Sequence, residues 1–391
     1  PPNEFIAGGT MITDTLQQAL HNTTRPWRQR LDNGRARLFQ ADALSQAEQT
    51  PYETLFDDGL VKLRYYPPLQ ENAIPLTDGT VMSVSRDTPR TPLVLVAPLA
   101  VNMLIYDLFP QRSLVRYLRA RGFELYMVDW GRPGKYHNHL SLSSYFADYL
   151  PKLLVQVRQH SGKQQLSLHG WSFGGLFSLC YTALGRDPDI KNLVLVGAPT
   201  DYHRNGALGA QYRRFSRRAK WIRRSTGLRI HDVPARLLRS PGWVNSLAFK
   251  LTNPVGSLQG YWNLVKNLHD RDFVSAHATN GAFLDDMVAY PGGVIQDIIR
   301  YLWTDNVVAH GQLPMEGTDG HLNRVTANVL NVTGASDPIV TPECSQAMEP
   351  LIRSKDKTFI TIEGGHMGIL GSAAAQKQSW GRIADWLIER D

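Results

Sequence analysis

Continuous apolar runs, rich in β-branched residues, alternate with helical patterns through most of the chain. Such runs are typical of strands that are buried on both faces of a parallel sheet. The runs expected as strands are Pro92–Pro98, Glu124–Trp130, Leu166–Leu168, Leu193–Gly197, Val329–Thr333 and Thr358–Ile362. Val61–Tyr66 alternates apolar and polar positions instead, which predicts a strand with one exposed face.

Strands that alternate with helices at this spacing indicate right-handed βαβ units and a mostly parallel, doubly wound α/β sheet. The alternation stops between about residues 200 and 310, where strand signals are few and Arg and Trp are frequent. We expect this segment to be an inserted helical lid or cap. The predicted organisation is an N-terminal helical extension (1–55), a first core part (56–203), the lid (204–310) and a second core part (311–391).

Composition favours an ordinary globular protein, because 42% of the 391 residues are hydrophobic and 20% are charged. No apolar run approaches the roughly 18 residues of a membrane-spanning helix. The first residues lack a basic segment followed by an apolar core, so a cytoplasmic protein is expected unless a leader has been processed. Cys180 and Cys344 have no motif spacing, which predicts neither a disulfide framework nor a metal site.

The heptapeptide His169–Gly175 places Ser172 at the centre of a G-x-S-x-G pattern. A strand signal precedes it and a helix signal follows, which is the context of a nucleophile elbow. Gly170 and Gly174 would supply the room that the sharp turn needs, and Gly175 would let the helix pack close to the strand. A chance match in a glycine-rich loop is the alternative, and the two flanking signals argue against it.

An activated serine needs a base and a carboxylate that orients the base. Asp337 and His366 each lie four residues past a predicted strand, in the chain order serine, acid, histidine that this kind of site uses. Asp356 and His169 are the rival acid and base, but Asp356 precedes its strand and His169 lies within one. The plainer alternatives are a turn role for Asp337 and a packing role for His366.

An oxyanion hole requires two backbone N–H groups. Phe173 follows the nucleophile directly, and Val101 lies in the loop after the strand at 92–98, with Ala100 or Leu99 as alternatives. No cofactor or metal is expected. Residues expected to contact substrate are Trp171, Asn102, Trp243 and Trp262. Trp243 and Trp262 would line an acyl channel in the lid, unless they only pack the lid.

Much of the net charge of +7 comes from residues 213–229, where arginines recur at helical spacing around Trp221. A solvated helix face is one interpretation. A phosphate site for coenzyme A, an acidic partner surface and nucleic acid are the others; nucleic acid is not expected.

On these residues the chain resembles the polyhydroxyalkanoate (PHA) synthase family, in particular its class III catalytic subunits. The matching motifs are Pro98–Asp107, Val128–Gly131, Leu140–Tyr145, Asp148–Pro151, the heptapeptide, Ala335–Pro342 and Gly364–Gly368. The resemblance implies an α/β-hydrolase fold with a lid, acting on 3-hydroxyacyl thioesters or polyesters. It also implies the roles given above for Ser172, Asp337, His366 and the Val101 loop.

The chain departs from that family at the nucleophile, because the synthases carry cysteine where this chain has Ser172. A Ser–His pair forms an oxyester that water hydrolyses readily. The sequence therefore predicts a serine hydrolase of an acyl ester, acyl-CoA or hydroxyacyl polyester. The alternatives are a synthase-like acyltransferase, and a non-catalytic module that binds polyester granules or a complex. A homodimer is left open.

Overall fold

The computed structural model describes residues 27–251 and 254–391. These residues form two compact units: one takes its residues from 1–46 and 249–285, and the other comprises 47–248 and 286–391. Residues 1–26 of the predicted N-terminal extension lie outside the described residues. The domain boundaries given above stay a prediction.

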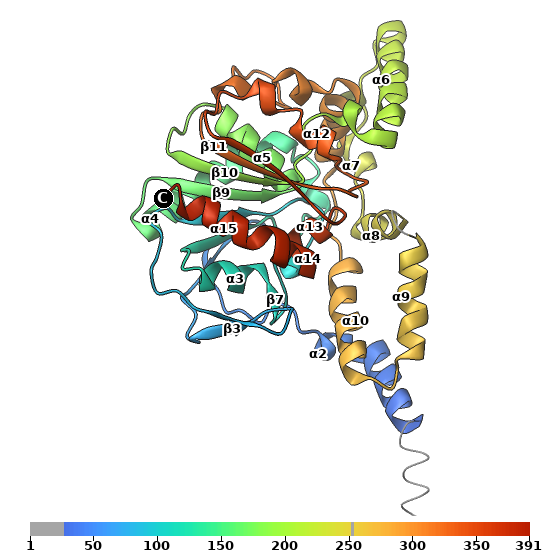
Figure 1. Cartoon of the computed structure of the whole chain (residues 1–391). Coiled ribbons are helices and arrows are strands. Elements are labelled where there is room, and N and C mark those ends of the chain that lie inside the picture. The colour runs from blue at the N-terminus through green and yellow to red at the C-terminus, as the bar shows by residue number, and fades with distance from the viewer. Residues whose placement is uncertain (1–26, 252–253) are drawn as a thin grey trace, which may run out of the picture. The chain divides into compact units, whose positions relative to one another are not determined.

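The larger unit is built on an eight-stranded sheet with the order β1-β2-β8-β5-β9-β10-β11-β12 (Figure 1). Its β1 and β2 are antiparallel to their neighbours, and the six remaining strands are parallel to one another. Each strand expected from an apolar run is present, so the hydrophobic pattern is confirmed. The strands are β1 (Glu53–Asp57), β2 (Lys62–Tyr66), β5 (Leu93–Val96), β8 (Leu125–Asp129), β9 (Leu166–Trp171), β10 (Ile190–Val196), β11 (Asn328–Gly334) and β12 (Lys357–Ile362).

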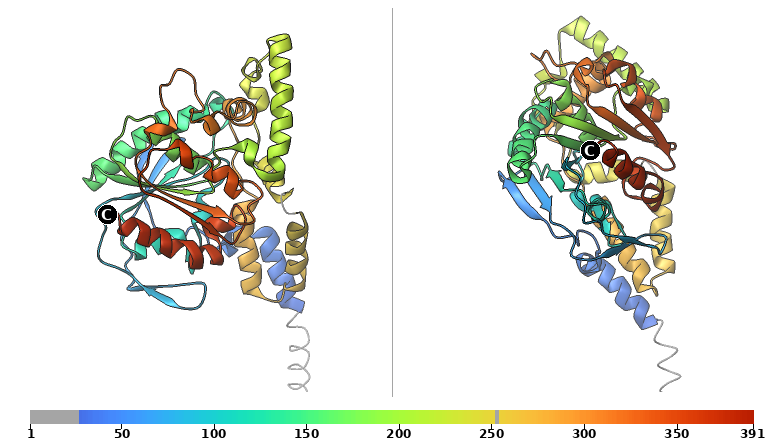
Figure 2. Two further views of the ribbon diagram at one scale, coloured as in Figure 1. Left: turned by 45° about the horizontal axis from the view of Figure 1, so that its top comes forward. Right: turned by 60° about the vertical axis from the view of Figure 1, so that its left-hand side comes forward.

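Helices cover both faces of this sheet, as the two views of Figure 2 show. On one face, α3 (Leu114–Ala120) and α15 (Gly381–Ile388) lie together, because Arg121 at the end of α3 pairs with Asp385 at 2.5 Å. On the other face, α5 (Phe173–Ala183) packs against the helical segment that leads into α4 (Leu150–Ser161), with the Phe177 and Tyr145 rings stacked at 5.7 Å. This is the doubly wound arrangement predicted from the sequence.

Smaller strands lie outside the main sheet. Val81–Ser83 forms β4, which pairs only with β3 (Ala73–Pro75) in a two-stranded sheet. A second pair joins β6 (Asp107–Phe109) and β7 (Arg112–Ser113). The apolar pattern does not predict β1, whose residues are mostly exposed.

Every described secondary-structure element between β10 and β11 is a helix, as expected. In the larger unit this segment contains α6 (Gly206–Thr226), α7 (Ala235–Leu238), α11 (Gly292–Asp297) and the π-helix η6 (Ile298–Thr304), as well as the start of α8 (Gly242–Leu251). In the smaller unit, α9 (Pro254–Lys266) and α10 (Arg271–Leu284) accompany a helix at residues 27–39 and α2 (Ala41–Leu44). Leu44 and Val274 belong to the apolar core of that unit. Among the described residues, no helix is both long and apolar enough to span a membrane.

Candidate active site

Ser172 occupies the turn between β9 and α5 with a backbone φ of 54° and ψ of −122°. A positive φ is strained for a residue with a Cβ, and such strain is typical of functional turns. The turn is possible because its neighbours are glycines: a Cβ on Gly170 would lie 2.3 Å from the Gly174 carbonyl oxygen, and one on Gly174 would lie 1.9 Å from that of Val96. A Cβ on Gly175 would lie 2.7 Å from that of Ala198, so close packing of α5 also requires glycine there.

The side chains of Ser172, His366 and Asp337 form one hydrogen-bonded series. His366 Nε2 lies 2.9 Å from Ser172 Oγ, and His366 Nδ1 lies 2.7 Å from Asp337 Oδ2. The three residues follow β9, β12 and β11, whose carboxyl ends meet at one edge of the parallel sheet. The structure therefore brings the expected serine, acid and histidine together. In this geometry Asp337 can hold the base His366 on one side, and His366 reaches the hydroxyl of Ser172 on the other.

Asp337 is held rigidly below the histidine. Its Oδ1 accepts hydrogen bonds from the backbone N–H groups of Ile339 and Val340, both at 2.9 Å, and only 3% of the residue is exposed. One carboxylate oxygen is thus used by its own loop, and the other is left for His366. Asp356, the rival acid, instead pairs with Arg390 at 2.6 Å.

Trp171, which the sequence predicts as a substrate contact, is buried against the loop of His366. Its indole Nε1–H donates to the carbonyl of His366 at 3.1 Å, its ring lies 5.6 Å from the imidazole, and it is 2% exposed. A buried side chain of this kind holds the histidine loop in place. Trp171 thus contacts the histidine loop directly, and the substrate contact expected of it stays a prediction.

The loop after β5 contains a second strained residue, Ala100, whose φ is 66°. Its carbonyl accepts a hydrogen bond from Val288 N–H at 2.9 Å. The end of β5 also lies close to the start of α5, because a Cβ on Gly174 would lie 1.9 Å from the Val96 carbonyl oxygen. This loop therefore runs beside the elbow, where an N–H group of Val101 would complement that of Phe173.

Phe173 is the first residue of α5, and the first N–H groups of a helix have no partner within the helix. They also lie at the positive end of the helix dipole. Both features suit an oxyanion that forms next to Ser172. The oxyanion roles of Phe173 and Val101 stay predictions.

Asn102 is engaged within the protein on both ends of its amide. Its Nδ2 donates to the Asp286 carbonyl at 3.0 Å, and its Oδ1 accepts from Leu104 N–H at 3.2 Å. These bonds tie the loop to the segment after α10. Asn102 therefore helps to hold this loop in place, and the substrate contact expected of it from the sequence stays a prediction.

The two lid tryptophans are mostly in solvent. Trp243 of α8 is 70% exposed and Trp262 of α9 is 62% exposed, with the Lys266 ammonium 5.3 Å from the Trp262 ring. Trp262 belongs to the smaller unit, whereas the triad belongs to the larger one. The acyl channel proposed for these rings stays a prediction.

One aromatic residue near the elbow was not singled out from the sequence. Tyr290 packs edge-on against Phe173 with ring centroids 6.3 Å apart. It comes from the segment after α10, more than a hundred residues away in the chain, so no local pattern points to it. The aromatic surface around the nucleophile therefore includes a residue of the inserted segment.

His169, the rival base, is buried in β9 with 1% exposure, and burial lowers its pKa to about 4. It is a neutral group of the core rather than a base at the sheet edge. Within the described part of the chain, no cluster of His, Cys, Asp or Glu is able to hold a metal ion.

Comparison with known proteins identifies the fold family. The family model described as alpha/beta hydrolase fold matches residues 101–373, which is most of the chain. The chain belongs to this family. The expected fold class is thereby confirmed, with the nucleophile, acid and histidine loops all at the edge where members of the family carry their site.

The chain is also similar to several poly(3-hydroxyalkanoate) polymerases and polymerase subunits. The subunit PhaC of Haloferax mediterranei is 25% identical over 95% of this chain and 72% of its own length, and that of Allochromatium vinosum is 27% identical over 96% and 98%. Among solved structures, a monoglyceride lipase from Saccharomyces cerevisiae is 17% identical with a TM-score of 0.49, covering 88% of this chain and 96% of its own. The resemblance to PHA synthases is confirmed over nearly the whole chain. Family and relatives together identify an enzyme, either an acyltransferase or a hydrolase.

Proposed function

We propose that this enzyme transfers a 3-hydroxyacyl group from a thioester to a hydroxyl acceptor through an acyl ester on Ser172. One observation carries the proposal: His366 uses one ring nitrogen toward Asp337 at 2.7 Å and the other toward Ser172 Oγ at 2.9 Å. The similarity to poly(3-hydroxyalkanoate) polymerase subunits supports the acyl group and favours transfer over hydrolysis. The sequence predicts hydrolysis first and acyl transfer as the alternative. The comparisons favour acyl transfer.

The first half-reaction forms the acyl-enzyme. Ser172 Oγ attacks the thioester carbonyl while His366 Nε2 takes the hydroxyl proton, and Asp337 stabilises the resulting imidazolium. The carbon–sulfur bond then breaks, and the thiolate takes the proton from His366. The N–H groups of Phe173 and Val101 would hold the oxyanion, at about 3–4 kcal/mol for each donor.

The second half-reaction reverses these roles. An acceptor hydroxyl gives its proton to His366 and attacks the acyl carbon, and Ser172 leaves and regains the proton. When the acceptor is the hydroxyl of another 3-hydroxyacyl group, the product is an ester-linked dimer. When the acceptor is water, the product is the free acid.

Hydrolysis is the second candidate because the nucleophile is a serine. A serine oxyester is open to attack by water that His366 activates. Which acceptor prevails depends on how well water is kept from the acyl-enzyme.

Product analysis separates the two reactions. The enzyme is incubated with 3-hydroxyacyl-CoA of several chain lengths, and the products are resolved by liquid chromatography and mass spectrometry, with Ser172→Ala as the control. Ester-linked hydroxyacyl products in excess of free acid support transfer. Free acid alone assigns the enzyme to the hydrolases, and equal turnover by Ser172→Ala contradicts both candidates.

A further inference from the structure

Outside the triad, the larger unit contains a cavity of about 580 Å³ between α6, the loop that follows it, and η6. A volume of this size is in the range of about 300–1,000 Å³ typical of small-molecule sites. Neither the triad nor the oxyanion loop lines it. It is therefore separate from the site that carries the proposed chemistry.

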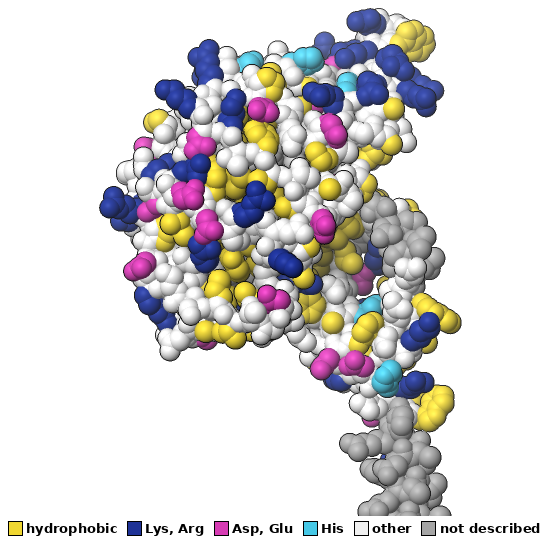
Figure 3. Space-filling model, viewed as in Figure 1, with side chains coloured by type: hydrophobic (Ala, Val, Ile, Leu, Met, Phe, Trp, Pro, Cys, Tyr) yellow, Lys and Arg dark blue, Asp and Glu magenta, His cyan; other side chains and the backbone are white. Residues whose placement is uncertain are grey.

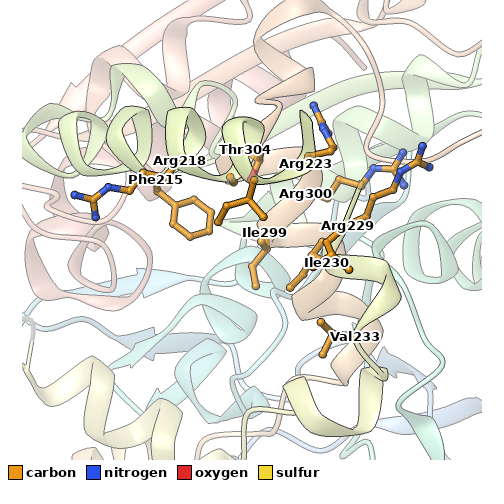
Figure 4. Close-up of a pocket in the computed structure, with 12 residues that line it drawn as sticks. Phe215, Arg218, Arg223, Arg229, Ile230, Val233, Ile299, Arg300 and Thr304 are labelled. Atoms are coloured by element: carbon orange, nitrogen blue, oxygen red, sulfur yellow. The ribbon is translucent and has the colours of Figure 1, made fainter. Parts of the chain in front are cut away.

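The middle of this cavity is apolar. Phe215 of α6 lies near Ile230 and Ile299 in it (Figure 4), and Ile222 of α6 also lines it. Phe215 is 40% exposed and Ile222 is 44% exposed, so both present apolar surface that a ligand would remove from water. A hydrocarbon chain is the chemistry that these walls accept.

One end of the cavity is cationic. Arg229 and Arg300 lie beside each other there (Figure 4). Glu316 pairs with Arg300 at 2.6 Å, whereas Arg229 forms no ion pair with a carboxylate among the described residues. Two carboxylates do lie near Arg229, because Asp232 Oδ2 accepts from its backbone N–H at 2.7 Å and its charge helps to lower the pKa of Glu316. Its guanidinium is paired with neither of them and so can still bind an external anion.

The surrounding surface adds to this positive field. The whole of α6 contains no Asp or Glu, and its Lys and Arg side chains gather over the helix in Figure 3. Arg223 is neutralised by Asp305 at 3.1 Å, while Arg218 lines the cavity with no carboxylate partner among the described residues. An anion is thus favoured here and a cation is repelled.

We infer that this cavity binds a single-chain anionic amphiphile, a medium-chain carboxylate, with its chain between Phe215 and Ile299 and its carboxylate on Arg229. Arginine suits this role because its guanidinium matches a carboxylate with two parallel hydrogen bonds. An anionic lipid surface is the competing occupant of α6. It would use the outward residues Arg217 and Trp221, which do not line the cavity.

Calorimetric titration of the full chain with decanoate, octanoate and hexanoate at pH 7.5 tests this inference. Decanoate is expected to bind, with affinity falling about fourfold for each methylene removed. Decyltrimethylammonium, which has the same chain length and the opposite charge, is expected not to bind the cavity.

Three exposed positions supply the variants. Arg229→Gln is expected to weaken decanoate binding about tenfold, through loss of a charge-assisted hydrogen bond. Ile222→Asp is expected to abolish it, because the new carboxylate lies in the apolar wall and repels the ligand. Arg217→Gln, on the same helix but outside the cavity, is the matched control and is expected to bind as the unmodified chain does.

Two results would overturn the inference. One is decanoate binding that Arg229→Gln and Ile222→Asp leave unchanged, which would place the ligand elsewhere. The other is binding to phosphatidylglycerol vesicles alone, weakened by Arg217→Gln as much as by Arg229→Gln, which would assign α6 to a lipid surface.

Discussion

The backbone N–H of Val288 donates a 2.9 Å hydrogen bond to the carbonyl of Ala100. Ala100 is also one of the few described residues other than glycine with a positive φ, at 66°. The inserted segment thus fixes the strained loop that carries Val101. Asn245 supports the same contact from α8, because its Nδ2 donates to the Val288 carbonyl at 2.7 Å. The loop after β5 is thus held by residues that lie far from it in sequence.

Substitutions at Ala100 test whether this strained conformation matters. Ala100→Gly is expected to keep the activity, because glycine adopts a positive φ without cost. Ala100→Val is expected to lower kcat on a p-nitrophenyl acyl ester about a hundredfold, because a β-branched residue resists that conformation and the Val101 N–H moves. Equal kcat for the two variants would show that the loop does not carry an oxyanion donor.

Trp171→Phe separates positioning from substrate binding. The phenyl ring keeps most of the packing but loses the indole hydrogen bond to the His366 carbonyl. That bond is worth about 1 kcal/mol, so kcat is expected to fall about fivefold with KM unchanged. A rise in KM at constant kcat would restore Trp171 to the substrate contacts predicted from the sequence.

Gly174→Ala tests the close approach of β5 to α5. Its Cβ would meet the Val96 carbonyl at 1.9 Å, and we expect the variant to lose at least about 3 kcal/mol in urea unfolding. Gly134→Ala is the control in the same unit, because the atom nearest to its Cβ is 3.7 Å away. The control is expected to stay within about 0.5 kcal/mol of the unmodified chain. Equal stability of the two variants would contradict the tight elbow.

The pKa of His169 should make the stability of the protein depend on pH. Burial lowers its pKa to about 4, below the usual value of about 6.5 in the unfolded chain. The unfolded state therefore binds more protons between these values. The neutral form of His169 therefore makes its full contribution to the free energy of unfolding above about pH 6.5. This contribution, on the order of 3 kcal/mol, is lost as the pH falls toward 4. His169→Met is expected to flatten this part of the curve in urea unfolding at a series of pH values, and an unchanged slope would contradict the assignment.

The sequence predicts the sheet well because strands buried on both faces have to be continuously apolar. It also predicts which loops meet, because Ser172, Asp337 and His366 each follow a parallel strand and parallel strands share a carboxyl edge. The proximity of the three residues then follows from the topology. β1 is missed because its exposed residues carry no apolar signal.

The sequence does not predict which side chains hold the loops of the site in place. Trp171 and Asn102 are polar or aromatic residues beside the expected site, and only their partners, the His366 and Asp286 carbonyls, show that they position it. Those partners are 195 and 184 residues away in the chain. Contacts of that range depend on tertiary packing and leave no periodic pattern.

The central claim is that Ser172 carries the acyl group. Mass spectrometry of the intact chain and of its Ser172 peptide, after brief exposure to 3-hydroxyacyl-CoA and rapid acid quench, measures this directly. We predict a mass increase of one hydroxyacyl group on Ser172, and none in Ser172→Ala. Turnover of the thioester with the acyl group on another residue, or with Ser172→Ala equally active, would contradict the account.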